Sequence, residues 1–423
     1  MLREAAYGLQ LPSDRAKLHE LAFNLIEAAF GGRAPEPPPL DAVNPPRYEW
    51  CPTDVVASEL SDHARQALTG RTGSVPADRF SVTPVLHLLY VRRAAEYAEK
   101  QFQVTEAISK WRELSDLLQG AARAEALRKA GALCFNTGRP KAAEELFDEA
   151  LMLARQAGHR RIESTVLTNL AIVYSETGRR EHAEQTGMLA LEGARESANR
   201  HGEGIIIRNL SELHRQTGRA ETGEKLIHEA LAIHREIGSE REEGPNLSAI
   251  GIIHQEARRL AQAEQYFEQA LAVTRRTGDR RFEGIVLGNL AVVCRQSGQM
   301  DKAEELYRQA MAIHREVGNR RSEGVSRGNL ATLYAVSGRH DLAEQTFLQA
   351  LAIHREVGNR RFEAVHLLAL ALLQLEESRH AEARETWQQG AAILQALGDK
   401  TLLQSQVTQM REWCAKAGVP PLE

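Results

Sequence analysis

The chain has 423 residues, of which 43% are hydrophobic and 26% are charged, and its formal net charge is −4. That length allows two or three globular domains or one extended array. The slightly acidic balance argues against nucleic-acid binding, which usually depends on a basic face.

Membrane and metal functions are also not expected. The sequence has no run of about eighteen apolar residues, so we expect no membrane span, and the N-terminus lacks the charged-then-apolar layout of a signal peptide. The four cysteines, Cys51, Cys134, Cys294 and Cys414, are not at the spacing of metal ligands. We therefore expect a cytoplasmic protein that holds no metal or other cofactor.

Residues 1–82 are predicted to form a small helical N-terminal region, either an adaptor or an N-terminal cap for the rest of the chain. Helices are expected from Ser13 to about Phe30 and from Thr53 to about Leu68. Between them, residues 34–52 carry seven of the chain's 14 prolines. Proline cannot donate a backbone hydrogen bond, so this stretch is predicted to be an extended connector. A ligand for a proline-reading domain is the alternative.

Residues 83–400 show an internal repeat. A divergent helical pair is expected at 83–120, and a forty-residue period then gives seven units over 121–400, each a helix, a turn, a second helix and a loop. Glycines recur at the turns, for example Gly298 and Gly338, where a left-handed residue ends a helix. Asp279, Asn319 and Asn359 are expected to cap the following helices. Residues 401–423 are predicted to be a capping helix for the last apolar face.

Small and bulky residues alternate within each second helix, as close helix packing requires. The small positions are Ala143, Ala183, Gly223, Ala263, Ala303, Ala343 and Ala383, followed by Ala150, Ala190, Ala230, Ala270, Ala310, Ala350 and Gly390; the bulky ones between them are Phe147, Ile227, Phe267, Tyr307, Phe347 and Trp387. This pattern resembles the tetratricopeptide repeat in a forty-residue form. The resemblance implies an all-α fold, a right-handed solenoid or superhelix, which acts as a non-catalytic scaffold and binds a peptide or protein in a concave groove. The sequence motifs of the repeats also resemble those of arrays attached to bacterial signalling and defence proteins.

One recurrence is not explained by helix packing. Asn169, Asn209, Asn289 and Asn329 each precede a first-helix leucine at multiples of forty residues. Asparagine is a poor helix former, and its amide both donates and accepts hydrogen bonds, as reading an extended peptide backbone requires. The positions resemble the asparagine ladder of kinesin light chains, which implies contact with a ligand. The alternative is that each amide bonds to the neighbouring repeat and stiffens the stack.

The asparagine series is interrupted in the unit 241–280. Ala249 takes the asparagine position, Pro245 lies near the first turn, and Arg258 replaces the turn glycine. We therefore expect this first helix to start late or bend, and the groove to consist of two half-sites. Helical spacing directs four arginines toward the groove, where they would suit an acidic segment or a C-terminal carboxylate, although a solvated surface charge is the alternative for each. These are Arg208, Arg215, Arg295 and Arg327.

Two further recurrences receive structural interpretations. His234, His314 and His354 are expected on helix surfaces, because repeats stack on the order of 10 Å apart, too far for one metal bound at about 2 Å. Paired arginines before each first helix are expected to pair with a nearby glutamate in a solvated motif; these are Arg160-Arg161, Arg280-Arg281, Arg320-Arg321 and Arg360-Arg361, with Glu163, Glu283, Glu323 and Glu363. A basic ridge for RNA is the alternative, which the net charge disfavours.

No catalytic motif is present: the sequence lacks GxxxxGK[ST], GxGxxG after a strand, HExxH and GxSxG. The protein is therefore not expected to be an enzyme. The favoured function is a scaffold that binds an extended peptide or partner protein. Two alternatives are a regulatory or inhibitory partner of a signalling or defence enzyme on another chain, and a peptide-sensing transcriptional regulator. The second is weakened because residues 1–82 show no helix-turn-helix pattern.

Overall fold

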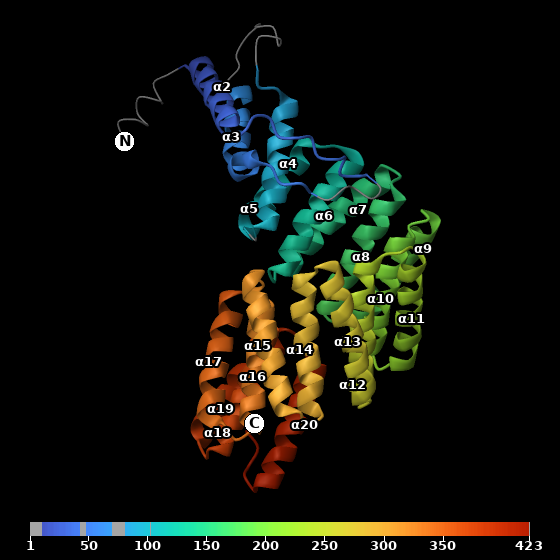
Figure 1. The fold of residues 1–423 in the computed structure, drawn as a ribbon, viewed down its shortest axis with the longest axis vertical. Helices are drawn as coiled ribbons and strands as arrows, with labels where there is room; N and C mark the ends of the chain where they lie inside the picture. The colour runs from blue at the N-terminus through green and yellow to red at the C-terminus, as the bar shows by residue number, and fades with distance from the viewer. Residues whose placement is uncertain (1–10, 43–47, 70–80, 102, 423) are drawn as a thin grey trace, which may run out of the picture. The chain divides into compact units, whose positions relative to one another are not determined.

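The computed structural model describes residues 11–42, 48–69, 81–101 and 103–422. These residues contain helices and connecting segments but no β-strand. The chain divides into two compact units, Met1–Asn169 and Leu170–Glu423; Figure 1 shows their helices. Within the described segments, no helix is both long enough and apolar enough to cross a membrane.

The first unit begins with both predicted N-terminal helices. Its elements are α2 (Pro12–Ala29), the 3-10 helix η1 (Pro52–Val56), α3 (Ala57–Thr69), α4 (Pro84–Lys100), α5 (Val104–Leu117), α6 (Gly120–Asn136), α7 (Pro140–Gln156) and the start of α8 (Arg160–Glu176). Phe23 of α2, Leu60 of α3 and Tyr90 of α4 are fully buried in one cluster. The N-terminal helices therefore share a core with the first helix after residue 83.

The proline-rich connector packs against this unit where it is described. The N–H of Ala34 donates to the Tyr90 hydroxyl at 3.2 Å, and that hydroxyl donates to Glu27 at 2.7 Å. Arg161 of α8 donates to the carbonyl oxygens of Asp41 and Ala42. Residues 43–47 of the predicted connector lie outside the described residues.

The second unit consists of helices in consecutive pairs. They are α9 (Arg180–Glu196), α10 (Arg200–Gln216), α11 (Ala220–Glu236), α12 (Glu240–Glu256), α13 (Leu260–Thr277), α14 (Arg280–Gln296), α15 (Met300–Glu316), α16 (Arg320–Val336), α17 (His340–Glu356), α18 (Arg360–Glu376), α19 (His380–Ala396) and α20 (Lys400–Ala417). Within this unit the most extensive contacts join α10 to α11, α12 to α13, α14 to α15, α16 to α17 and α18 to α19. Figure 1 shows the order of these helices. The predicted helix-turn-helix repeat is confirmed.

The alternating small and bulky positions form the core of the repeats, as predicted. Ala263 and Ala270 of α13 are fully buried on either side of Phe267, which is also fully buried. At Gly223 of α11, an added Cβ would lie 2.9 Å from the carbonyl oxygen of Ser211 in α10. The two backbones are therefore so close at this crossing that no larger residue fits without a shift.

The turns also follow the prediction, with one exception in the capping. Gly298 and Gly338 have φ of +78° and +72°, and Arg258 adopts the same left-handed conformation at +59° without being glycine. Asp279 accepts a hydrogen bond from the N–H of Phe282, and Asn319 does the same for Ser322. Asn359 makes no such bond, so the predicted cap is wrong there.

The prediction that the helix containing Pro245 starts late is wrong. α12 runs from Glu240 to Glu256 in the same register as the other first helices, with Pro245 inside it. Pro245 lies in the second turn of α12 and removes one backbone hydrogen bond, the one to the carbonyl of Arg241. Packing against α13 keeps the helix in place.

At several junctions of the array, a buried glutamate joins one repeat to the next. Glu323, only 1% exposed, accepts from Arg315 at the end of α15 at 2.9 Å and from Arg320 at the start of α16 at 2.5 Å. The same arrangement recurs at Glu163, Glu203, Glu283 and Glu363. The predicted pairing with the first arginine of each doublet is confirmed, but the carboxylates are buried rather than solvated.

The recurrent histidines are buried, so their predicted place on helix surfaces is wrong. His234, His314 and His354 are at most 1% exposed. Their rings fill space left by glycines on the partner helix: a Cβ added to Gly284 of α14 would lie 2.7 Å from the His314 ring. Gly204 and Gly324 face His234 and His354 in the same way. Each histidine ring therefore packs directly against the backbone of a glycine on the partner helix.

This contact predicts opposite effects for two glycines of one helix. Alanine normally stabilises a helix interior by about 1 kcal/mol relative to glycine. Gly284→Ala should instead lower the free energy of unfolding by about 1–3 kcal/mol, because the new methyl group overlaps His314. Gly288→Ala is the matched control, since its Cβ would meet only the Ser326 hydroxyl at 3.4 Å. Urea unfolding followed by circular dichroism measures both; equal effects would contradict the packing account.

The buried histidines also predict a pH dependence. Burial lowers the pKa of His366 to about 3 and that of its hydrogen-bond partner His354 to about 4. Below the ordinary value of 6.5 the unfolded chain therefore binds protons that the folded chain does not, and stability falls as the pH is lowered toward 4.

Replacing one of these histidines should weaken this dependence. His366→Ile, which carries the residue found at the equivalent position 206, should reduce the slope of unfolding free energy against pH between about pH 6.5 and about pH 5 by up to one proton. His380→Ala removes an exposed histidine and should leave the slope unchanged. An unchanged slope in the His366 variant would contradict its burial as a neutral ring.

Candidate functional site

The first helices of the second unit carry the predicted asparagines in register. Asn209 of α10, Asn289 of α14 and Asn329 of α16 each precede a buried leucine, and all three side chains are half-buried. Their amides make no hydrogen bond to any residue that the structure describes, in the neighbouring repeat or elsewhere. Asn169 belongs to the first unit, where its Nδ2 atom is buried without a partner among the described residues.

A hollow of about 670 Å³ lies beside these residues, centred on α12. It is lined by His201, Arg208, Arg241, Glu242, Pro245, Ser248, Ala249, Ile252, Asp279, Phe282, Ile285 and Asn289. The residues come from α10, α12 and α14 and the turn before α14, so the hollow crosses three successive first helices. It brings together two of the predicted residues, Arg208 and Asn289. The others in the second unit do not line it: Asn209, Asn329, Arg215, Arg295 and Arg327.

Three of the predicted arginines are engaged within the repeats. Arg208 donates to Glu242 of the next first helix at 2.7 Å. Burial disfavours the charge of Arg215, but its ion pairs with Glu212 and Glu256 hold its pKa above the ordinary value. Arg327 turns to Gln349 of α17 at 2.6 Å and to Glu323 at 2.9 Å.

Arg295 differs from these three because no carboxylate binds it among the described residues. Its Nε atom is buried and unpartnered, close to the hydroxyl of Tyr307 in α15. Burial raises the pKa of Tyr307 to about 12, and the nearby positive charge of Arg295 opposes that shift. Of the four predicted arginines, Arg295 is therefore the one whose charge is least neutralised by neighbouring carboxylates. An anionic group of a ligand would be attracted to it most strongly.

Sequence reasoning missed the apolar wall of the hollow. Ile252, Phe282 and Ile285 are half-buried and face it from α12 and α14. The signal in the sequence is weak: Glu212 and Thr332 stand at positions equivalent to Ile252, but Ile172, Val292 and Leu372 at the other equivalent positions are apolar.

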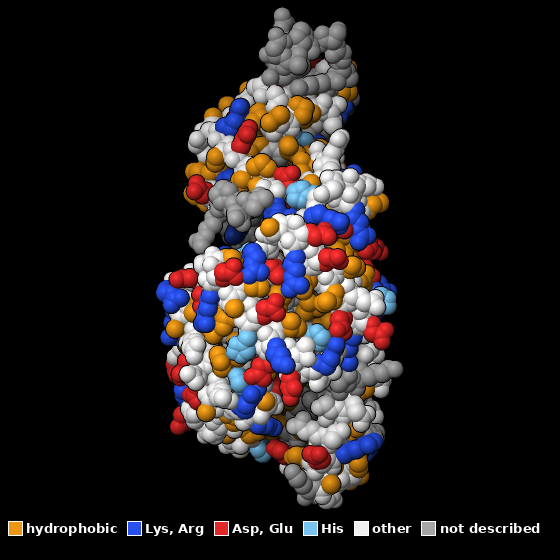
Figure 2. Space-filling model, turned by 90° about the vertical axis from the view of Figure 1, so that its right-hand side faces the viewer, with side chains coloured by type: hydrophobic (Ala, Val, Ile, Leu, Met, Phe, Trp, Pro, Cys, Tyr) orange, Lys and Arg blue, Asp and Glu red, His pale blue; other side chains and the backbone are white. Residues whose placement is uncertain are grey.

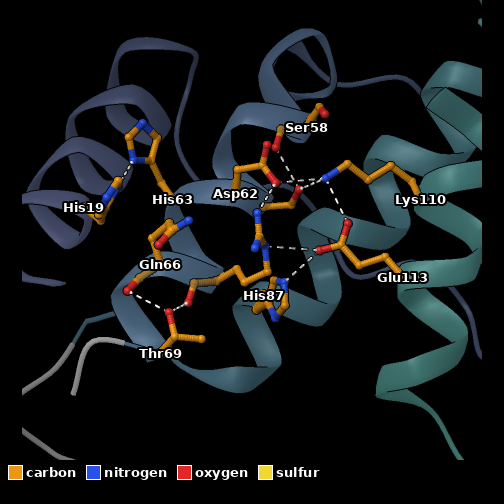
Figure 3. Close-up of polar contacts among 11 residues, drawn as sticks. His19, Ser58, Asp62, His63, Gln66, Thr69, His87, Lys110 and Glu113 are labelled. Atoms are coloured by element: carbon orange, nitrogen blue, oxygen red, sulfur yellow. Dashed lines mark hydrogen bonds and ion pairs between the residues drawn. The ribbon is translucent and has the colours of Figure 1, made fainter. Parts of the chain in front are cut away.

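The first unit holds a second polar cluster, between α3, α4 and α5 (Figure 3). Lys110 of α5 donates to Ser61 at 2.8 Å, to Asp62 at 3.2 Å and to Glu113 at 3.0 Å. Glu113 also lies 3.4 Å from His87 of α4. The cluster thus joins three helices through one buried lysine and one carboxylate.

The chemistry of this cluster is structural. The contact with His87 and the hydrogen bond and charge of Lys110 outweigh burial and lower the pKa of Glu113 to about 2, so it stays ionised and cannot act as a general acid near neutral pH. Nearby, the Nδ1 atoms of His19 and His63 are 2.8 Å apart (Figure 3). In the described segments, no three histidine, cysteine or acidic side chains are placed to hold a metal ion.

Charged side chains of both signs are mixed over the repeat array (Figure 2). This follows from the pairing of arginines with glutamates between successive repeats, as in Arg219 with Glu184 and Arg259 with Glu224. The face shown presents no continuous basic surface.

Comparison with known proteins places these observations in a family. A family model described as tetratricopeptide repeat matches residues 122–196, 203–276, 245–316, 281–355 and 322–396. No curated protein sequence matches the chain.

Solved structures with a similar fold include three of interest. A Rap protein complexed with competence and sporulation factor has a TM-score of 0.61 at 13% identity, covering 92% of this chain and 99% of its own. The apo form of the quorum sensor NprR from B. thuringiensis has a TM-score of 0.52 at 14% identity, with coverages of 80% and 94%. A signal transduction ATPase with numerous domains and a tetratricopeptide repeat sensor, from Pyrococcus horikoshii, has a TM-score of 0.50 at 17% identity.

The match to the Pyrococcus protein covers 82% of this chain but only 54% of that chain, so this chain spans about half its length. At these identities the likenesses show the fold alone. The family model, in contrast, matches more than half of the residues of this chain. The chain belongs to the tetratricopeptide repeat family.

Proposed function

We propose that the first-helix face of the second unit, formed by α10, α12, α14 and α16, binds an extended peptide or an extended segment of a partner protein. The observation that carries the proposal is the set of amides on Asn209, Asn289 and Asn329. They are half-buried, occur in register, and have no hydrogen-bond partner among the described residues. Where they are exposed these amides bond to solvent, and a ligand backbone would take the place of that water.

An asparagine amide suits an extended backbone because it donates and accepts at once. Each peptide unit of a ligand offers one N–H and one C=O, so one asparagine can bond both. Such recognition depends on the main chain, and side-chain pockets then provide selectivity. In this proposal residues 83–400 form the binding array, residues 1–82 attach to its start, and residues 401–423 close its end.

Two similar structures are complexes, and one of them holds a peptide. A Rap protein is complexed with competence and sporulation factor, and a Rap conjugation gene regulator is in complex with the Phr* peptide. The second match has a TM-score of 0.55 at 13% identity. We propose a non-catalytic, cytoplasmic binding protein, in which a regulatory effect on an enzyme or a gene would follow from the bound state. Arg295 would bind a carboxylate of the ligand, either from an acidic side chain or from its C-terminus.

The proposal predicts that the asparagines control affinity. A random peptide library of about twelve residues, which extend to about 40 Å, is selected against the protein, and the best peptide is titrated by calorimetry. Asn289→Ala with Asn329→Ala should raise Kd by about 10- to 100-fold, because each substitution removes hydrogen bonds worth about 1 kcal/mol.

The control replaces two exposed amides on a second helix. Gln265→Ala with Gln269→Ala on α13 should leave Kd within about twofold. If the two double variants bind equally well, or if the library yields no peptide, the groove is not the binding site proposed here.

A further inference from the structure

The interruption of the asparagine series coincides with the hollow on α12. At position 249 the asparagine is replaced by alanine, and the preceding residue, Ser248, has a short side chain. Ile252 and Ile285 supply apolar surface to the hollow, and Phe282 closes it from α14. The missing amide therefore leaves an apolar recess rather than a gap in the helix, which is continuous through this repeat.

The charges at the rim of the recess are neutralised in pairs. Arg208 of α10 binds Glu242 of α12 at 2.7 Å, and Arg241 lies 3.6 Å from Asp279, the residue before α14. Each cation thus has an anion on the next helix or turn. To bind here, a charged ligand side chain would have to break one of these ion pairs. It would also lose its hydration, which costs free energy. The charge pattern is complementary to an uncharged side chain.

The recess lies between two asparagines at a spacing that fits an extended chain. Successive repeats stack on the order of 10 Å apart, and an extended peptide advances about 3.3 Å per residue. One repeat therefore corresponds to about three ligand residues. Asn209 and Asn289, two repeats apart, would hold backbone units about six residues apart, with the recess at the third residue.

From this placement we infer that the recess around Ala249 is a specificity pocket for one large apolar side chain of the bound peptide. The ligand class is an extended peptide with Leu, Ile, Met or Phe about three residues from each of two backbone units held by Asn209 and Asn289. Ala249 is the residue that makes room for this side chain. The inference rests on the proposed function and adds the residue type that the groove selects.

The test combines peptide selection with a substitution that fills the recess. The random library is selected against the wild-type chain and against Ala249→Trp, with Ala272→Trp on the exposed side of α13 as the matched control. Peptides selected by the wild-type protein and by Ala272→Trp should share one large apolar position. Peptides selected by Ala249→Trp should lack it.

Calorimetric titration then assigns the contact. Replacing the shared apolar residue by alanine in a synthetic peptide should raise Kd for the wild-type protein at least about tenfold. Ala249→Trp should raise Kd for the unsubstituted peptide to the same extent. When the peptide substitution and Ala249→Trp are combined, their effects on the binding free energy should not add. Ala272→Trp should bind within about twofold of wild type. Circular dichroism checks the fold of both tryptophan variants, and the peptide substitution tests the pocket without any protein variant.

The outcomes separate this inference from the proposed function. Peptides that depend on Asn289 but show no apolar preference, or that carry aspartate or glutamate at the shared position, overturn the pocket and retain the groove. Additive effects of the peptide and Ala249→Trp changes also overturn the pocket. A library that yields no peptide overturns the groove and the pocket together.

Discussion

The close approach of paired helices at small residues is the constraint on which the repeat array depends. Where Gly223 or Ala263 meets the partner helix, little space remains, and the bulky neighbour, such as Phe267, must lie beside the crossing. The same demand explains the glycine and histidine pairs, since the ring of His314 occupies the space that a side chain at Gly284 would need. Each repeat buries its apolar surface only against its neighbours, so these positions recur with the period of the chain.

Apart from these packing positions, many charged residues form ion pairs that link one repeat to the next. Glu323 is enclosed between arginines that end one helix and begin the next, and this arrangement fixes the turn between repeats. Burial raises the pKa of that carboxyl, but the hydrogen bonds from Arg315 and Arg320 outweigh it and leave the pKa below its ordinary value. Most arginines of the first helices are committed in this way. The asparagine amides are not, and they lie half-buried on the first helices without a partner among the described residues.

Sequence reasoning predicted the fold well because the packing is periodic. A forty-residue self-match determines helix positions, turns and core residues together, and the turn conformations at Gly298 and Gly338 agree with it. It failed where the environment depends on the partner helix. His354 looks like a surface residue by helical spacing, but Gly324 on the facing helix makes room for its ring. Pro245 looked like a late helix start, but packing against α13 holds the helix in register. The asparagine positions were visible in the sequence, whereas the ion pairs of Arg208 and Arg215 and the recess at Ala249 required knowledge of the neighbouring helices.

The central claim is that the unpaired asparagine amides on the first helices hold a ligand backbone. The most direct measurement is a crystal structure of the chain with a peptide selected from the random library. The account predicts an extended peptide across α10, α12, α14 and α16, with its main-chain N–H and C=O groups bonded to the amides of Asn209, Asn289 and Asn329. A peptide bound on the second helices, or bound to the first helices with these amides still without partners, would contradict it.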